Sequence, residues 1–273
     1  MSPGARWLAA GLAAAAIAAS AALASGLSHA WRSAQPVKPD GCVLTALALS
    51  VHLDPHQAGN AMTIAATATR EGLPAHAVTI AIATALQESK LRNLSYGDRD
   101  SVGLFQQRPS QGWGTAEQIQ DPRYASTKFF GALSRIRGWQ TMPVAEAAQL
   151  VQHSADGSAY AQWETQARTL AVATTGQAAE GVACTYRRHA GDPAKLAARV
   201  GADYGPHALD RPAVSTARGW EIAGFLVVHA TEYRVAQVSY LGRTWKPSSG
   251  RWVAGGTADG RVRFTTAAAP SPG

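Results

Sequence analysis

Glu88 is the residue whose type and position best suit chemistry. Ala81, Ala85 and Glu88 are spaced at i, i+4 and i+7, so a helix would place them on one stripe, facing inward or into a cleft. Small apolar neighbours and the negative end of a helix dipole both disfavour the ionised form of a carboxyl group. A carboxyl group so placed can protonate a leaving oxygen at neutral pH, as cleavage of a glycosidic bond requires. Lys90 and Arg92 would oppose this effect if they folded back, and a lone Glu on a helix is more commonly solvated or salt-bridged.

Capping residues predict where the helices that position this glutamate begin and end. Asp54 and Pro55 form an N-cap and a first helical residue, and the helix that they open is predicted to stop at Gly72. A second helix, which contains the glutamate, begins near Pro74. Residues 92–114 lack a helical period and are rich in Gly, which predicts an irregular loop or short hairpin. Further helices are predicted to begin at Asp121-Pro122 and near Pro143, and to cover residues 160–174.

The sequence pattern changes after about residue 186. Residues 218–234 are predicted to form a helix, and three segments after it have the composition of short strands, namely 235–242, 250–256 and 261–265. The expected fold class is therefore α+β, with a mainly helical domain followed by a small α+β domain. The expected organisation is a leader over 1–30, a spacer over 31–41, a first domain over 42–184, a second over 185–265 and a flexible tail over 266–273.

The leader and the net charge bear on location and partners. Residues 7–27 are mostly Ala and Leu without a charge, which is typical of a signal peptide or an N-terminal membrane anchor. We therefore expect an extracytoplasmic protein, either secreted to the cell wall or anchored to the membrane. The net charge of +7 favours anionic surroundings or serves solubility alone, and the scattered basic residues argue against nucleic acid as a partner. No Gly-rich phosphate loop follows a predicted strand, so no nucleotide or flavin cofactor is expected.

The chain contains two cysteines, Cys42 and Cys184. In an exported chain an even number of cysteines favours a disulfide over two free thiols. The bridge would close a loop of 184 − 42 = 142 positions, for which the chain-entropy model predicts about 4 to 5 kcal/mol of stabilisation. The two cysteines are thus predicted to link the edges of the first domain.

Three motifs begin at the end of the glutamate's helix. They read Glu88-Ser89, Gly97-Asp98 and Gly103-Leu104-Phe105-Gln106. Together they resemble the signature of the lytic transglycosylase and goose-type lysozyme superfamily, in which a Glu-Ser pair precedes a Gly-Leu-Met-Gln turn. The resemblance spans roughly residues 55–175 and is closer still to a group of exported actinobacterial lysozyme-like proteins. It implies a helical lysozyme-like fold and peptidoglycan as the partner. We also expect the chain to act as a monomer.

This resemblance also implies the reaction. Glu88 would protonate the bridging oxygen of the glycan strand and then act as a general base. In a transglycosylase the 6-hydroxyl of the sugar closes a 1,6-anhydro ring, so no second carboxylate is needed. A hydrolase instead needs a group that activates water, for which Asp98 is the candidate and Asp100 the weaker one, although a Gly-Asp pair is also a common turn former. Trp113 would stack on a sugar ring, and burial in the core is the alternative for this side chain.

Supporting residues follow from the same resemblance. Ser89 would orient the loop, and Gln106 would reach the substrate or the catalytic glutamate. The family's Tyr-Asn motif has no match here, because the nearest residues are His153 and Ser154. Tyr160, from the turn that follows, is the candidate substitute, and a packed core tyrosine is the alternative.

The C-terminal segment resembles domains of exported actinobacterial wall proteins that are related to zinc-dependent D-Ala peptidases. Those domains end in an Asp-His-x-His strand, whereas residues 259–263 here read Asp-Gly-Arg-Val-Arg. His207 and Asp210 alone would hold a metal weakly, because zinc normally takes three protein ligands. We therefore expect no metal site and a wall-binding or spacing role for this segment.

Three functions remain open at this point. The first is an enzyme that cleaves peptidoglycan glycan strands by a lytic transglycosylase or lysozyme mechanism. The second is a non-catalytic wall-binding or structural protein that keeps a lysozyme-like groove. The third is a structural partner in a secretion or division assembly. Glu88 favours the first, because a binding protein has no need for an acid beside small apolar residues.

Overall fold

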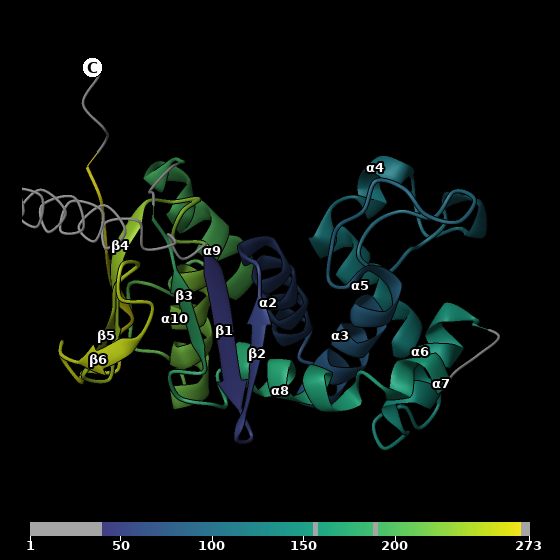
Figure 1. Ribbon diagram of the computed structural model, residues 1–273, viewed down its shortest axis with the longest axis horizontal. Helices are drawn as coiled ribbons and strands as arrows, with labels where there is room; N and C mark the ends of the chain where they lie inside the picture. The colour runs from purple at the N-terminus through teal and green to yellow at the C-terminus, as the bar shows by residue number, and fades with distance from the viewer. Residues whose placement is uncertain (1–39, 155–157, 188–190, 269–273) are drawn as a thin grey trace, which may run out of the picture. The chain divides into compact units, whose positions relative to one another are not determined.

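A computed structural model describes residues 40–154, 158–187 and 191–268 (Figure 1). The expected leader and most of the expected spacer lie outside these ranges, as does the end of the expected tail. Within the ranges, no helix has the length and hydropathy needed to cross a bilayer.

The fold class is α+β, as predicted, because helices and two antiparallel sheets together form the described part of the chain. Of the predicted helices of the first part, those that begin at Pro55, near Pro74, at Pro122 and near Pro143 are present with small shifts at their ends, whereas the helix predicted over 160–174 is interrupted at residues 162–163. The helices up to residue 174 are α2 (Pro55–Arg70), α3 (Ala75–Ser89), η1 (Pro109–Gln111), α4 (Ala116–Ile119), α5 (Pro122–Leu133), α6 (Val144–Gln152), α7 (Ser158–Ala161) and α8 (Glu164–Thr174). The helices after it are η2 (Pro193–Lys195), α9 (Leu196–Tyr204) and α10 (Thr216–Val228).

Local capping explains where α2 and α5 begin. The Asp54 side chain accepts a hydrogen bond from the backbone N–H of Gln57, and the Gln57 side chain accepts one from the backbone N–H of Asp54, which completes a capping box. Asp121 likewise accepts a hydrogen bond from the Arg123 backbone N–H and precedes a proline. The predicted helix starts at these two aspartates are therefore confirmed.

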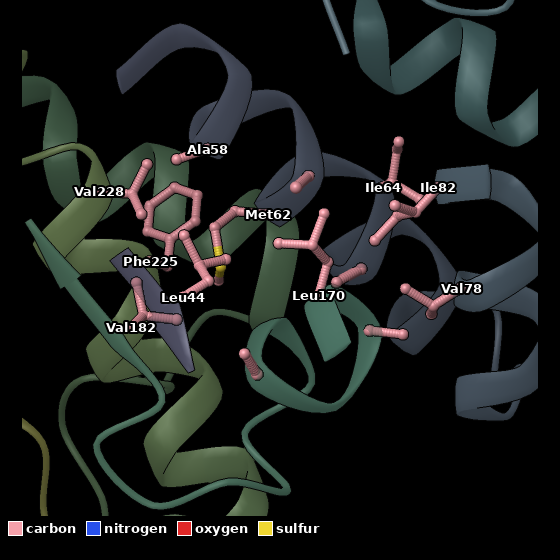
Figure 2. Close-up of a cluster of buried hydrophobic side chains, with 14 of the residues drawn as sticks. Leu44, Ala58, Met62, Ile64, Val78, Ile82, Leu170, Val182, Phe225 and Val228 are labelled. Carbon is pink, nitrogen blue, oxygen red and sulfur yellow. The ribbon is translucent and has the colours of Figure 1, made fainter. Parts of the chain in front are cut away.

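The hydrophobic core lies between α2, α3, α8 and α10 (Figure 2). Met62 and Ile64 of α2 and Ile82 of α3 are fully buried in it, together with Leu170 of α8 and Phe225 of α10. The many alanines of α2 and α3 have short side chains, so neighbouring helices can approach closely. This packing fixes the direction in which the C-terminal end of α3 points.

A three-stranded antiparallel sheet in the order β2-β1-β3 packs against α8, α10 and α2 (Figure 1). Its strands are β1 (Gly41–Ala46), β2 (Leu49–Leu53) and β3 (Val182–Thr185). Cys42 of β1 and Cys184 of β3 stand opposite each other in the register and form the predicted disulfide. The hairpin between β1 and β2 was not predicted, and its turn residues Leu47 and Ala48 both have positive φ values of 52° and 60°.

The second sheet has the order β6-β5-β4-β7 and packs against α10 through β4. Its strands are β4 (Val235–Tyr240), β5 (Arg243–Trp245), β6 (Trp252–Ala254) and β7 (Arg263–Thr266). The helix predicted over 218–234 is wrong in its bounds, because α10 ends at Val228. The chain reverses there, with the Val235 N–H bonded to the Ala230 carbonyl, so that β4 can pair with β7.

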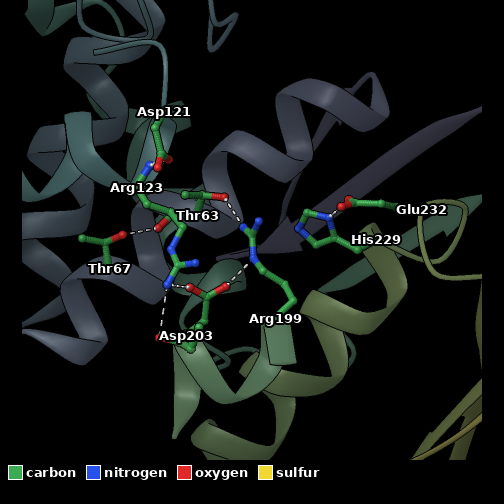
Figure 3. Close-up of polar contacts among 9 residues, drawn as sticks. Thr63, Thr67, Asp121, Arg123, Arg199, Asp203, His229 and Glu232 are labelled. Carbon is green, nitrogen blue, oxygen red and sulfur yellow. Dashed lines mark hydrogen bonds and ion pairs between the residues drawn. The ribbon is translucent and has the colours of Figure 1, made fainter. Parts of the chain in front are cut away.

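The described residues from Asp40 onward pack as one compact unit. Helix α10 contacts α2 and β3 as well as β4, and the ion pairs of Asp203 join α9 to α5 (Figure 3). The buried Asp203 carboxylate lies 2.8 Å from Arg199 Nε and 3.1 Å from Arg123 Nη2. The predicted boundary between 184 and 185 stays a prediction.

Glu221 of α10 makes the stability of this packing depend on pH. Its side chain is 3% exposed, and it contacts Arg218 at 2.9 Å and accepts a hydrogen bond from the Thr69 hydroxyl at 2.8 Å. Burial raises the pKa of Glu221 to about 7, against the lowering effects of Arg218 and Thr69. Because the folded state holds this proton more tightly than the unfolded state, with its pKa of 4.5, the stabilisation is complete below pH 4.5 and is lost as the pH rises towards 7.

We therefore expect Glu221→Gln to remove this pH dependence. Relative to the variant, the wild type should lose about 3 kcal/mol of unfolding free energy between pH 4.5 and pH 8. Urea denaturation of both proteins across this pH range measures the difference, with the exposed Glu146→Gln on α6 as the matched control. A wild-type to variant difference that stays constant with pH would contradict the expectation.

Candidate functional site

Side chains of α2 hold the C-terminal end of α3, where the candidate acid is located. Gln57 Nε2 donates a hydrogen bond to the Lys90 carbonyl at 2.8 Å, and Asn60 Nδ2 donates one to the Leu91 carbonyl at 2.7 Å. Lys90 and Leu91 both have left-handed backbone conformations, with φ values of 56° and 61°. These bonds satisfy carbonyls that the end of a helix would otherwise leave without partners, so the last turn of α3 is fixed in place.

The structure brings Tyr160 to Glu88. The Tyr160 hydroxyl donates a hydrogen bond of 2.8 Å to Glu88 Oε1, although the two residues are 72 positions apart. Tyr160 is buried and Glu88 is partly buried. Ser154 hydrogen-bonds to the same tyrosine. Burial, together with the acceptor and the charge of Glu88, raises the pKa of Tyr160, so the phenol stays protonated and remains a donor.

Neither of the two neighbouring basic residues turns to Glu88. Lys90 Nζ lies 4.2 Å from the ring centroid of Trp163, and Arg92 forms an ion pair of 2.6 Å with Asp54. Within the described ranges, no ion pair is formed with the Glu88 carboxyl group. Lys90 and Arg92 therefore do not fold back onto the Glu88 carboxyl group, which was the alternative that the sequence left open.

The turn over Gly103-Leu104-Phe105-Gln106 is held between α3 and α6. Ser89 Oγ donates a hydrogen bond to the Leu104 carbonyl at 2.7 Å, and Gln152 Nε2 donates one to the Phe105 carbonyl at 2.7 Å. The buried Phe105 ring stacks on Phe129 of α5, with a centroid distance of 4.6 Å. Ser89 thus fixes the turn to the residue next to the candidate acid.

Gln106 folds back onto its own loop. Its Nε2 atom donates hydrogen bonds to the Tyr96 carbonyl at 3.2 Å and to the Gly103 carbonyl at 3.3 Å. The side chain also packs against Gly97, where an added Cβ would overlap the Gln106 amide. The glycine of the Gly97-Asp98 motif is therefore needed for close approach, and a contact of Gln106 with substrate or with the acid stays a prediction.

The two acidic residues of the loop differ in their surroundings. The Asp98 side chain is 92% exposed and has only a loose ion pair with Arg99, at 3.9 Å. Asp100 accepts bonds of 2.8 Å from Arg108 Nε and from the Ser110 backbone N–H, and these contacts hold its pKa far below the usual range. Asp100 is therefore bound as a carboxylate within the loop, and a water-activating role for Asp98 stays a prediction.

No protein-family model matches the chain, and no curated protein matches it. The case for a function therefore depends on the residues and on their geometry.

Trp113 lines a separate groove of about 960 Å³ between the η1 turn, α5 and α6. The tryptophan is partly buried there. His153 also lines this groove, and the next residue, Ser154, hydrogen-bonds to Tyr160. Glu88 and Tyr160 are not among the lining residues, and stacking of Trp113 on a sugar stays a prediction.

The C-terminal residues that the peptidase resemblance would place at a metal site are His207, Asp210 and Asp259. His207 Nδ1 lies 3.6 Å from Asp210, and both side chains are exposed. Asp259 is paired with Arg263. In the described ranges, no group of three or more His, Cys, Asp or Glu side chains could hold a metal ion.

Sequence reasoning missed the polar residues that support the site from other elements. These are Gln57, Asn60, Gln152 and, as a partner of Tyr160, Ser154. Gln57 had a local signal, since it completes the capping box with Asp54. The other three had none, because their partners are distant in the chain.

Proposed function

We propose that the protein cleaves the glycan strands of peptidoglycan, with Glu88 as the general acid and base. The observation that carries the proposal is the 2.8 Å hydrogen bond from Tyr160 to Glu88 at the fixed end of α3. A buried phenol that orients one carboxyl oxygen leaves the other oxygen for the substrate. An arrangement of this kind suits proton transfer to a bridging oxygen.

In this proposal Tyr160 is a positioning residue and Glu88 is the catalytic residue. Glu88 gives its proton to the glycosidic oxygen as the bond breaks and then takes a proton from the attacking hydroxyl group. Ser89 and Gln152 keep the adjacent turn in place during both steps, since each bonds to a carbonyl of that turn.

The loop contacts favour the sugar's own 6-hydroxyl as the attacking group. Asp100 is bound to Arg108 and Ser110, and Asp98 points into solvent, so neither lies in surroundings that suit activation of a bound water. Intramolecular attack would need no second carboxylate and would leave a 1,6-anhydro sugar. We therefore propose a lytic transglycosylase, for which the disulfide supports the expected location outside the cytoplasm.

Purified sacculi test this proposal. The chain from Asp40 onward is incubated with them, and the soluble products are identified by mass spectrometry. Products that end in 1,6-anhydro sugars are expected. Reducing ends would instead indicate a hydrolase and give Asp98 a role, whereas binding to sacculi without release of products would favour the non-catalytic wall-binding protein.

Tyr160→Phe tests the positioning contact. Loss of the donor should lower kcat about tenfold with KM unchanged, because the hydrogen bond orients the carboxyl group that transfers the proton. Product release measured over a range of sacculus concentrations separates the two parameters. Tyr204→Phe is the matched control, since the Tyr204 hydroxyl is buried and has no hydrogen-bond partner among the described residues. An unchanged kcat in Tyr160→Phe would show that the contact is only structural.

A further inference from the structure

The groove between η1, α5 and α6 is lined by basic and apolar side chains. Helix α5 lines one wall and α6 the opposite one. The lining residues are Gln111, Gly112, Trp113, Thr127, Lys128, Gly131, Ala132, Arg135, Ile136, Leu150, Val151 and His153. A Cβ added at Gly131 would meet no atom within 4 Å, so this wall borders open space.

The charges of the groove are all of one sign. Lys128 and Arg135 are exposed, are seven positions apart on and just after α5, and form no ion pair in the described part of the chain. None of the lining residues carries a carboxylate. At the rim, Glu71 hydrogen-bonds to Thr127 and is compensated by the neighbouring Arg70. The groove therefore presents positive charge that the protein itself does not neutralise.

The floor of the groove is apolar. Ile136 and Val151 contribute to it, and Leu150 is 45% exposed at its edge. A chain of phosphates would use the cations but would gain nothing from this floor. A short peptide with small apolar side chains and free carboxylates would use both.

We infer that this groove binds the acidic peptide stems attached to the glycan strand. The inference rests on the proposed function, because His153 lines the groove and the next residue, Ser154, hydrogen-bonds to Tyr160, the partner of Glu88. A glycan strand cut at Glu88 carries its stems to within reach of this surface. Lys128 and Arg135 pair with the stem carboxylates, and the apolar floor contacts the alanine methyl groups. The protein thereby selects strands whose stem carboxylates are free.

The test measures binding, so that it does not depend on cleavage. The full-length chain with Glu88→Gln is titrated by calorimetry with a purified disaccharide tetrapeptide, and with the same compound after chemical amidation of its carboxylates. Amidation should weaken binding about tenfold, as should Lys128→Gln with Arg135→Gln, which corresponds to about 1.4 kcal/mol for the loss of two exposed ion pairs. The amidated compound should bind equally to the double variant and to its parent. The matched control is Lys246→Gln with Arg251→Gln, two exposed basic residues outside the groove, which should change nothing.

Several results would overturn the inference. These are equal binding of the free and amidated compounds, no loss in the groove variant, or an equal loss in the control variant. Tight binding of polyphosphate that depends on Lys128 and Arg135 would assign the groove to a phosphate-rich wall polymer instead. If stems bind as expected while sacculi are not cleaved, the proposed enzymatic function fails and the stem site stands. If sacculi are cleaved but free and amidated stems bind equally, the enzymatic function stands and the stem site fails.

Discussion

Glu88→Gln is expected to lower the rate of glycan cleavage by a factor of about 10² to 10⁴, the usual contribution of a general acid or base. The amide has the shape of the carboxyl group and keeps an oxygen that can accept the Tyr160 hydrogen bond, so the fold should be unchanged. The rate of release of anhydro-sugar products from sacculi measures the effect. Affinity for sacculi should stay the same.

The control for this experiment is Glu117→Gln, an exposed carboxylate in the first turn of α4. It should keep full activity. Residual activity of more than a tenth in Glu88→Gln would mean that another group delivers the proton, and the proposed mechanism would be wrong.

Removal of the disulfide is expected to have the largest effect on stability. The bridge between Cys42 and Cys184 closes a loop of sequence separation 142, and the chain-entropy model predicts a loss of about 4 to 5 kcal/mol of unfolding free energy in Cys42→Ala with Cys184→Ala. The loss should be the same for wild type under reducing conditions, because β1 and β3 remain paired in the folded state of both. Guanidinium denaturation with and without reductant measures it.

A small loss would contradict this expectation and would indicate that the unfolded chain is already compact. Comparison of reduced wild type with the double variant is the internal control, since both lack the bridge and differ only in the thiol groups. The experiment also bears on location, because a chain that needs this bridge is suited to an oxidising environment.

Features with local causes could be predicted from the sequence. The starts of α2 and α5 at Asp54 and Asp121 follow from an aspartate before a proline, and both caps form within three residues of each aspartate. The α+β class could be predicted from hydrophobic periodicity, which is also a local signal. In the C-terminal segment the predicted helix extends beyond Val228, because the turn after α10 is set by the pairing of β4 with β7, and α9 and β5 were not predicted.

The hairpin of β1 and β2 shows why other features could not be predicted. Its turn uses Leu47 and Ala48 at positive φ, where a sequence signal would be Asn or Gly. What stabilises the hairpin lies elsewhere in the chain, since β1 also pairs with β3 and is bonded to it through Cys184. A local sequence pattern cannot predict the pairing of β1 with β3, because these strands are far apart in the chain.

The helix that contains Glu88, the candidate acid, and the pairing of the two cysteines could be predicted from the sequence. The hydrogen bond from Tyr160 to Glu88, the other partners of Lys90 and Arg92, and the groove that Lys128 and Arg135 line without a carboxylate became visible only in the folded chain. Helix caps and periodicity act over a few residues and can therefore be recognised in a linear sequence. A hydrogen bond across 72 positions depends on how the helices pack against one another, and that packing is decided by the whole core at once.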